Sequence, residues 1–300
     1  MRARRPARIL LLMTHTTEIA SLPTAAEAAP AYALKRSREE YERLTRQAAL
    51  FRGMTQRLFD AAGLAPGMRV LDVGSGAGDV AFLAAELVGP EGVVVGVDVD
   101  GAALANARAR AELLGLQNVR FVEGDVRTAA LDNDFDAAVG RLVLMYLEDP
   151  AQALRAIAAR VRSGGVIAFQ ELDLDPGVDG RSLPGGTLWD ETGQLVIETF
   201  VLAGAHVRMG RQLYGAFLAA GLAAPAMFEE ALVGGGPDFA AYAWLAGVVH
   251  SLAPLMHGLG LATTEDLGLD TLAERIRDDA VTGRAVVWTP PLIGAYARTR

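Results

Sequence analysis

A glycine-rich turn between an apolar strand pattern and an apolar helix pattern constrains the fold of this chain more than any other feature. Residues 68–73 (MRVLDV) predict a buried strand, and the sequence GSGAG follows it directly. A helical apolar stripe comes next, formed by Val80, Leu83, Ala84 and Leu87. Because glycines in such a turn let a ligand approach the backbone closely, the segment predicts a β–α unit with a binding site.

The alternation of apolar strands and helices continues to residue 172. Further buried strand patterns cover residues 93–97, 119–122, 135–139 and 166–172. Continuously apolar strands that alternate with helices of 10–15 residues indicate a parallel, doubly wound sheet. With two later strand-like segments, 227–233 and 285–288, we expect an α/β fold with a mostly parallel, Rossmann-like sheet of seven strands.

Helical patterns flank this alternating region. One begins at residue 34 and continues after Gly53, and others cover 189–204 and 209–220. Thr271 and Glu274 have the spacing of a capping box and predict the start of another helix. Residues 1–30 show no hydrophobic period, and we expect this segment to be mobile.

The composition excludes several classes of protein. Hydrophobic residues make up 51% of the 300 residues and charged residues 21%, which excludes a disordered chain. The chain has 28 basic and 36 acidic residues, and its net charge of −8 argues against binding to nucleic acid. The absence of cysteine excludes disulfides, thiolate metal sites and a cysteine nucleophile.

Two apolar segments resemble membrane or targeting signals only superficially. The apolar run at residues 9–13 is shorter than the ~7–15 apolar residues of a secretory signal peptide. Residues 239–264 carry no formal charge, but they include two histidines and a proline. We expect them to form either a buried lid or a subunit interface, and the second alternative would imply a homodimer. The chain as a whole predicts a cytoplasmic protein without a membrane partner.

Acidic residues occur at the carboxyl ends of three successive predicted strands. Asp72, Asp98 and Asp125 occupy these positions, where open α/β sheets bind ligands. Asp79 stands where the dinucleotide pattern GxGxxG needs a glycine, and it would repel a pyrophosphate at the following helix. Carboxylates on both sides of the turn favour a cationic ligand, such as one with an amine and a sulfonium. Asp79 could equally serve as a helix N-cap.

These motifs resemble those of class I S-adenosylmethionine-dependent methyltransferases over residues 41–175. The matching pieces are VLDVGSGAG, the end of VVVGVDVD, NVRFVEGDV and the run from FDAAVGRLVLMYLEDP to FQELD. That last run is similar to the corresponding region of ubiquinone and menaquinone C-methyltransferases. The chain also resembles actinobacterial secondary-metabolite enzymes. The resemblance implies S-adenosylmethionine as the cofactor. The cofactor-binding residues that it implies are Tyr41, Asp72, Gly74, Ser75, Gly76, Gly78, Asp98, Val99, Asp125, Val126 and Arg141.

The resemblance also implies a division of the chain. Residues 31–66 would form N-terminal helices that cover the cofactor, and residues 67–175 would form the cofactor-binding core. Residues 176–300 would complete the sheet and add a helical lid over the substrate. The apolar character of that lid predicts a dry pocket for a small aromatic or heterocyclic acceptor rather than a nucleic acid.

Three residues are candidates for acid–base chemistry, and no residue pattern predicts a metal site. Glu171 ends the fifth predicted strand, His206 lies between two helical patterns, and His250 lies in the uncharged segment. Each also has a structural interpretation, as a capping carboxylate, a loop histidine and a core histidine. The acceptor atom stays open between indole C3 of a tryptophan-derived diketopiperazine, with pyrroloindoline formation, and an oxygen or nitrogen of another secondary metabolite. A protein of this fold that binds the cofactor without transferring a methyl group is the remaining alternative.

Overall fold

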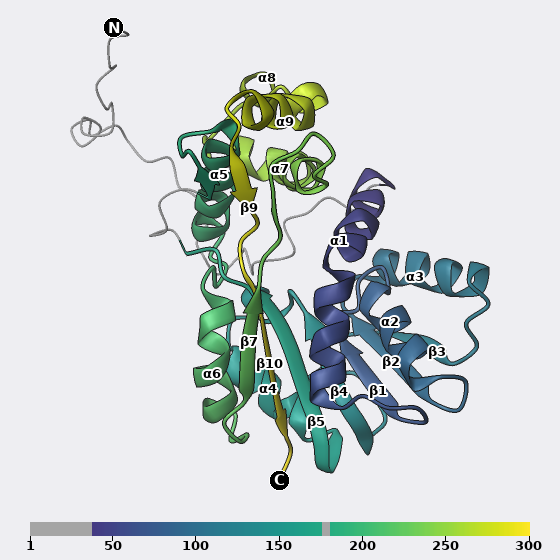
Figure 1. Cartoon of the computed structure of the whole chain (residues 1–300). Helices are drawn as coiled ribbons and strands as arrows, with labels where there is room; N and C mark the ends of the chain where they lie inside the picture. Colours follow the sequence, from purple (N-terminus) through teal and green to yellow (C-terminus); the bar gives the residue numbers. More distant parts are fainter. Residues whose placement is uncertain (1–37, 176–180) are drawn as a thin grey trace, which may run out of the picture.

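The computed structural model describes residues 38–175 and 181–300 (Figure 1). The segment 1–30, for which the sequence predicts mobility, lies outside the described residues. The side chain of Tyr41 also lies outside them, although its backbone belongs to helix α1 (Arg38–Ala62).

A seven-stranded sheet forms the centre of the molecule. Its strand order is β3-β2-β1-β4-β5-β10-β7. The bounds are β1 (Arg69–Val73), β2 (Val93–Asp98), β3 (Val119–Glu123), β4 (Phe135–Arg141), β5 (Val161–Leu172), β7 (Ala226–Glu230) and β10 (Leu292–Arg298). The pairs from β3 to β5 are parallel, whereas β10 is antiparallel to both β5 and β7. The mostly parallel, Rossmann-like sheet predicted from the sequence is therefore confirmed.

Helices cover both faces of this sheet. Helices α1 and α2 (Asp79–Val88) contact each other on one face, and α4 (Pro150–Ala158) and α6 (Met209–Ala219) contact each other on the other face (Figure 1). Helix α3 (Gly101–Leu113) packs against β3. The central strands are apolar along their whole length because both of their faces are buried, as Val94, Val95 and Val97 of β2 show.

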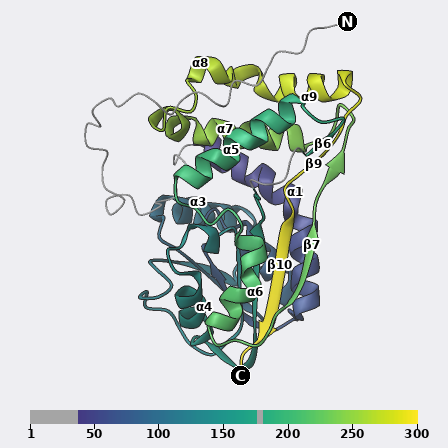
Figure 2. The ribbon, with the colours of Figure 1, turned by 90° about the vertical axis from the view of Figure 1, so that its left-hand side faces the viewer.

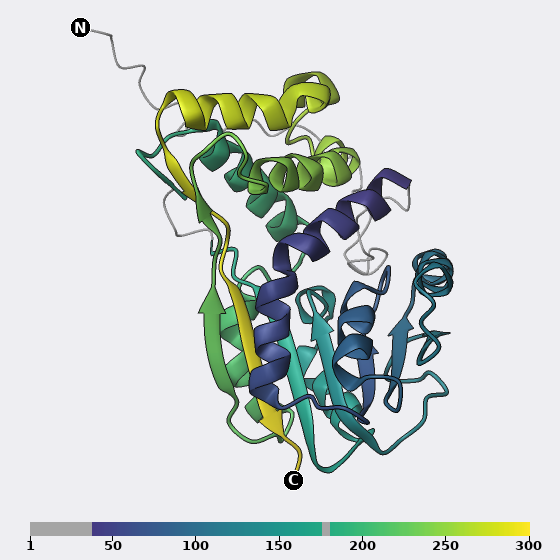
Figure 3. The same cartoon turned by 45° about the vertical axis from the view of Figure 1, so that its right-hand side comes forward.

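A second unit, called the cap below, lies over the carboxyl ends of the parallel strands. It consists of α5 (Leu188–Leu202), α7 (Ala241–Gly258), α8 (Thr264–Leu267), α9 (Leu272–Thr282) and a small sheet of β6 (Ser182–Leu183), β9 (Val286–Trp288) and β8 (Val233–Gly234). Helix α1 runs from the sheet up to α7 (Figure 3). None of the helices within the described residues, α7 included, is long and apolar enough to cross a membrane.

Two extended segments connect the cap to the sheet. One leads from β7 up to β8, and the other leads from β9 down to β10 (Figure 2). They are joined where the backbone N–H of Thr289 donates to the carbonyl of Leu232 at 3.0 Å and the N–H of Leu232 donates to Thr289 Oγ1 at 3.0 Å. The cap is thus tied to the same strands that close the sheet.

Two local predictions were wrong. The strand expected at residues 285–288 is β9 of the cap, and the seventh strand of the main sheet is β10, which begins only after Pro290 and Pro291. Thr271 directly precedes α9 but forms no capping box, because a short 3₁₀ turn runs into this helix and its backbone (φ −116°, ψ 3°) is not extended as in a capping box.

Candidate active site

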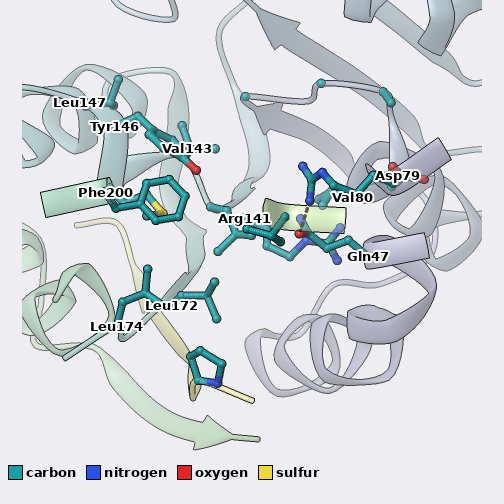
Figure 4. A pocket seen from close by; sticks show the side chains of 18 of the residues that line it. Gln47, Asp79, Val80, Arg141, Val143, Tyr146, Leu147, Leu172, Leu174 and Phe200 are labelled. Atoms are coloured by element: carbon teal, nitrogen blue, oxygen red, sulfur yellow. Dashed lines mark hydrogen bonds between the residues drawn. The ribbon is translucent and has the colours of Figure 1, made fainter. Parts of the chain in front are cut away.

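A cavity of about 330 Å³ lies between the carboxyl ends of the parallel strands and the cap. Its lining comes from the loops that follow β1 to β4, from α1, and from α5 and α7 of the cap. Figure 4 shows Arg141 near the middle, with Asp79 and Val80 on one side and Phe200, Leu172 and Leu174 on the other. The side near Asp79 is called the cofactor lobe below, and the side near Phe200 is called the acceptor lobe.

The turn between β1 and α2 forms the floor of the cofactor lobe. Gly74 has φ +67°, and an added Cβ would lie 2.4 Å from Cγ2 of Val143, so the neighbouring loop fills the space beside it. Gly76 has φ +50°, and an added Cβ would meet nothing within 4 Å. Because Gly76 lines the cavity, the open space beside it is where a ligand can approach the backbone.

Asp98 at the end of β2 joins this turn to the next loop. One carboxylate oxygen accepts the backbone N–H of Gly76 at 2.8 Å, and the other accepts that of Asp100 at 2.8 Å. Burial raises the pKa of Asp98, although these two N–H groups oppose the increase. A carboxylate has about four acceptor sites, so the backbone N–H groups leave acceptor capacity for a hydroxyl group in the cavity. Asp98 therefore both shapes the turn and can bind a ligand diol.

The end of the cofactor lobe beyond β3 is more exposed. Asp125 forms an ion pair with Arg127, and hydrogen bonding to this arginine lowers the pKa of the Asp125 carboxyl. Both side chains line the cavity, together with Val99 and the buried Val126. A flat heterocycle could lie between these two valines and accept or donate hydrogen bonds at the Asp125–Arg127 pair.

A buried group of charges lies beneath the centre of the cavity. Asp72 is fully buried, and neither of its carboxylate oxygens has a hydrogen-bond partner among the described residues. Burial raises its pKa well above the usual range, while the nearby Arg141 acts in the opposite direction. Arg141 lines the cavity, donates to Thr55 Oγ1 at 2.9 Å, and has its own pKa lowered by burial. Asp79 is paired with Arg110 at 2.7 Å.

Aromatic and aliphatic side chains dominate the acceptor lobe. Tyr146 and Phe200 lie with their ring centroids 6.3 Å apart. Figure 4 places Leu172 and Leu174 on the same side. Other apolar residues that line the cavity are Met145, Trp189, Ile197, Trp244, Leu245 and Val248. They come from the segment after β4 and from α5 and α7, so the cap supplies much of the apolar lining.

The structure brings most of the predicted cofactor-binding residues together. The residues that line the cavity are Gly74, Ser75, Gly76, Asp98, Val99, Asp125, Val126 and Arg141. Asp72 lies buried on β1 and does not line the cavity. Gly78 packs against Phe82 instead, since an added Cβ would lie 2.6 Å from its ring.

The three predicted catalytic residues do not line the cavity. Glu171 is fully buried, and its Oε1 accepts the backbone N–H groups of Val143 at 2.9 Å and Leu144 at 2.8 Å. His206 Nε2 lies 2.9 Å from the carbonyl oxygen of Leu147. Glu171 and His206 thus hold the two ends of the segment that lines the cavity after β4. The side chain of His250 is exposed on α7.

Sequence reasoning missed a polar group on α1. Gln47 lines the cavity, and its Oε1 accepts hydrogen bonds from Arg43 at 2.9 Å and from Trp244 Nε1 at 3.0 Å. This group ties α1 to α7 above the cavity. The spacing of four residues predicts that Arg43 and Gln47 lie on one face of a helix. Nothing in the sequence predicts that Trp244 lies beside them.

Comparison with known proteins identifies the domain that builds this cavity. A family model described as a methyltransferase domain matches residues 64–202. This range contains the glycine turn, Asp98, Asp125 and Arg141. Residues 64–202 form a class I S-adenosylmethionine-dependent methyltransferase domain.

Individual proteins resemble this methyltransferase domain over part of their length. Aklanonic acid methyltransferase of Streptomyces sp. strain C5 is 36% identical over 138 residues, which cover 46% of this chain and 62% of that protein. A ubiquinone/menaquinone biosynthesis C-methyltransferase of Pasteurella multocida is 32% identical over 122 residues, which cover 39% of this chain and 46% of that protein. The chain thus spans less than two thirds of the length of either curated relative.

The fold of the whole chain is similar to that of solved structures. Geranyl diphosphate C-methyltransferase from Streptomyces coelicolor A3(2) has a TM-score of 0.52 at 15% identity, and the match covers 87% of this chain and 84% of that one. At this identity the likeness concerns the fold alone. The cofactor of the family is S-adenosylmethionine, and the residues of the cofactor lobe fit it. Asp98 has free acceptor sites for the ribose, and Gly76 opens onto the cavity.

Proposed function

We propose that this protein transfers a methyl group from S-adenosylmethionine to a small aromatic or heterocyclic acceptor. The observation that carries the proposal is the division of one cavity into two lobes of different chemistry. One lobe has a glycine turn and acidic side chains, and the other has aromatic and aliphatic walls supplied by the cap. Gly74, Arg141 and Val143 lie where the two lobes meet.

The residues of this chain have to bind the cofactor and the acceptor, align their reacting atoms and exclude water from the cavity. S-adenosylmethionine supplies a methyl group that its sulfonium already activates. Asp98 and Gly76 hold the cofactor, and the carboxylate of Asp79, which lines the cavity, favours its positive charges. Alignment of the reacting atoms in a dry cavity can contribute about 7–11 kcal/mol to the reduction of the barrier. The cap over the cavity supports this role, because it covers the cavity with side chains such as Trp189, Phe200 and Trp244.

Glu171 and His206 fit positioning roles better than direct proton transfer. Both bind the backbone of the segment 143–147, which lines the cavity on the acceptor side. We infer that they fix the shape of the acceptor lobe without touching the acceptor. His250 is exposed, so we assign it no contact with the acceptor.

The acceptor atom separates two versions of the proposal. In one version, carbon 3 of an indole in a tryptophan-derived diketopiperazine is methylated and ring closure follows. In the other, an oxygen or nitrogen of another natural product is methylated. The aromatic walls of the acceptor lobe support both versions. A protein that binds the cofactor without transferring its methyl group would retain cofactor binding and give no methylated product.

The test is methyl transfer from methyl-labelled S-adenosylmethionine to a panel of indole diketopiperazines, phenols and aromatic acids. Labelled product with equimolar S-adenosylhomocysteine is expected, whereas cofactor binding without product from any acceptor would refute the proposal. Gly193 on α5 lines the cavity, and an added Cβ would meet nothing within 4 Å. Gly193→Phe should therefore fill the acceptor lobe and abolish transfer while S-adenosylhomocysteine still binds. Gly215→Phe is the matched control, because Gly215 on α6 has equal space but is exposed outside the cavity.

A further inference from the structure

Arg181 is the charged residue of the cavity whose presence the proposed function does not explain. It directly precedes β6 of the cap, is half-buried, and lines the cavity. Its backbone N–H donates to Asp190 Oδ1 at 2.5 Å, which fixes the main chain at this point. Its guanidinium has one hydrogen bond within the described residues, a long one of 3.4 Å from Nη2 to the carbonyl oxygen of Asp173. Most of its five donors are therefore unused.

The carboxylates near Arg181 are already bound by other arginines. Asp173 Oδ2 accepts Arg211 Nε at 2.5 Å, and Asp175 forms ion pairs with Arg211 at 2.8 Å and with Arg208 at 3.0 Å. No carboxylate of residues 38–175 or 181–300 lies within ion-pair distance of Arg181. Within the described residues, this cluster has three guanidinium groups, and its two carboxylates pair with Arg208 and Arg211. Among these residues, Arg181 is the guanidinium of the cluster that lines the cavity without an ion pair.

Asp190, the other acidic residue at this end of the cavity, does not neutralise Arg181 either. Its carboxylate accepts hydrogen bonds from the backbone N–H groups of Arg181, Gly186 and Thr187 and from the hydroxyl of Ser182. Burial lowers the pKa of Arg181, so this charge is held in a place that disfavours it. A half-buried charge without a counter-ion is costly unless a ligand pairs with it.

The position of Arg181 separates it from the reacting end of the cofactor. Its guanidinium lies beside the carbonyl of Asp173, next in the chain to Leu174. Figure 4 shows Leu174 on the side of the cavity opposite Asp79 and Val80. A group bound to Arg181 would therefore lie at the far end of the acceptor lobe, with the aromatic walls between it and the glycine turn.

We propose that the acceptor carries a carboxylate, which pairs with Arg181 at the far end of the acceptor lobe. The planar guanidinium can hold a carboxylate through two parallel hydrogen bonds. The ring of the acceptor then lies between the aromatic walls, and the methylated atom is one other than the carboxylate. This inference rests on the proposed function, since it identifies the class of acceptor for the same cavity. Arg181 is a specificity-determining residue in this account.

The experiment compares an aromatic acid with its neutral isostere. The protein is first saturated with S-adenosylhomocysteine, and 2-naphthoate or 2-naphthamide is then titrated into it in a calorimeter. We expect 2-naphthoate to bind more tightly than the amide, and Arg181→Gln to weaken naphthoate binding about 10- to 100-fold, as expected for hydrogen bonds to a charged group. Binding of 2-naphthamide should stay within about two- to threefold of the parent protein, because a neutral amide gains little from the charge.

Control variants separate the role of Arg181 from general effects. Arg181→Lys keeps the charge but loses the two-point geometry, so its naphthoate affinity should lie between those of the parent and Arg181→Gln. Arg277→Gln removes an exposed positive charge from α9 of the same cap and should change neither affinity. Equal affinity for acid and amide, no binding of the acid, or equal losses for both probes in Arg181→Gln would each overturn the inference. Failure of S-adenosylhomocysteine to bind in the first step would instead refute the proposed function.

Discussion

Replacement of Glu171 by glutamine should change how the stability of the protein depends on pH. Glu171 is fully buried, and burial raises its pKa from 4.5 to about 7, against the effect of the N–H groups of Val143 and Leu144. Its second oxygen, Oε2, has no partner among the described residues. The neutral acid fits this site, because Oε1 can accept both N–H groups while Oε2 holds the proton. A glutamine side chain has the same shape and cannot ionise.

The magnitude follows from the two pKa values. Below pH 4.5 the carboxyl group is protonated in both the folded and the unfolded chain. Between pH 4.5 and about 7 the unfolded chain loses this proton and the folded chain keeps it, so rising pH favours unfolding. At about 1.36 kcal/mol for each pH unit between the two values, the parent loses about 3 kcal/mol, of which about 2–3 kcal/mol falls between pH 5 and pH 8.

Urea denaturation of the parent and of Glu171→Gln at pH 5 and pH 8 measures this difference. The free energy of unfolding of the parent should fall by about 2–3 kcal/mol more than that of the variant over this range. Glu112→Gln, which removes an exposed carboxyl group from α3, should retain the pH dependence of the parent. Parallel pH profiles for the parent and Glu171→Gln would refute the reasoning, since they would mean that Glu171 is already ionised in the folded chain.

Further predictions concern the cofactor lobe and the cap. Asp98→Ala should weaken S-adenosylhomocysteine binding by about 1–3 kcal/mol in calorimetry, while the exposed Asp60→Ala should not; equal affinities would contradict the role of Asp98. Gly76→Ala should weaken cofactor binding more than Gly115→Ala, which introduces a side chain at a similar backbone angle of +68° away from the cavity; the same affinity for both would show that no ligand approaches Gly76. Hydrogen exchange of residues 237–262 should slow when S-adenosylhomocysteine and 2-naphthoate are added, while residues 69–73 stay protected throughout. Unchanged exchange in 237–262 would mean that this segment is a fixed part of the fold.

The residues of the cofactor lobe could be predicted because each of them follows a strand that the sequence pattern predicts. The glycine turn follows β1 directly, and Asp98 and Asp125 each follow one strand. Parallel strands bring their carboxyl ends to one edge of the sheet, so local patterns were enough to predict which side chains share a lobe. Only the exact partners, such as the N–H of Gly76 on Asp98, required the structure.

The acceptor lobe could not be predicted in the same way. Its walls include Tyr146, Leu172 and Phe200, which lie on three separate elements that meet only in the folded chain. Glu171 and the two histidines were selected by residue type. Glu171 and His206 bind backbone groups of the segment after β4, whereas His250 is exposed on α7. The missed strand β10 did carry a signal, since an apolar run follows Pro290 and Pro291. Its antiparallel position between β5 and β7 depends on long-range pairing that no local pattern encodes.

The most direct test of the central claim is a calorimetric titration of the parent protein with S-adenosylhomocysteine and, separately, with NADH. We expect S-adenosylhomocysteine to bind at one site per chain and NADH not to bind, because Asp79 stands at the start of α2, where a pyrophosphate would lie. Binding of NADH without binding of S-adenosylhomocysteine would contradict the account, since the cavity would then belong to a dinucleotide-binding protein.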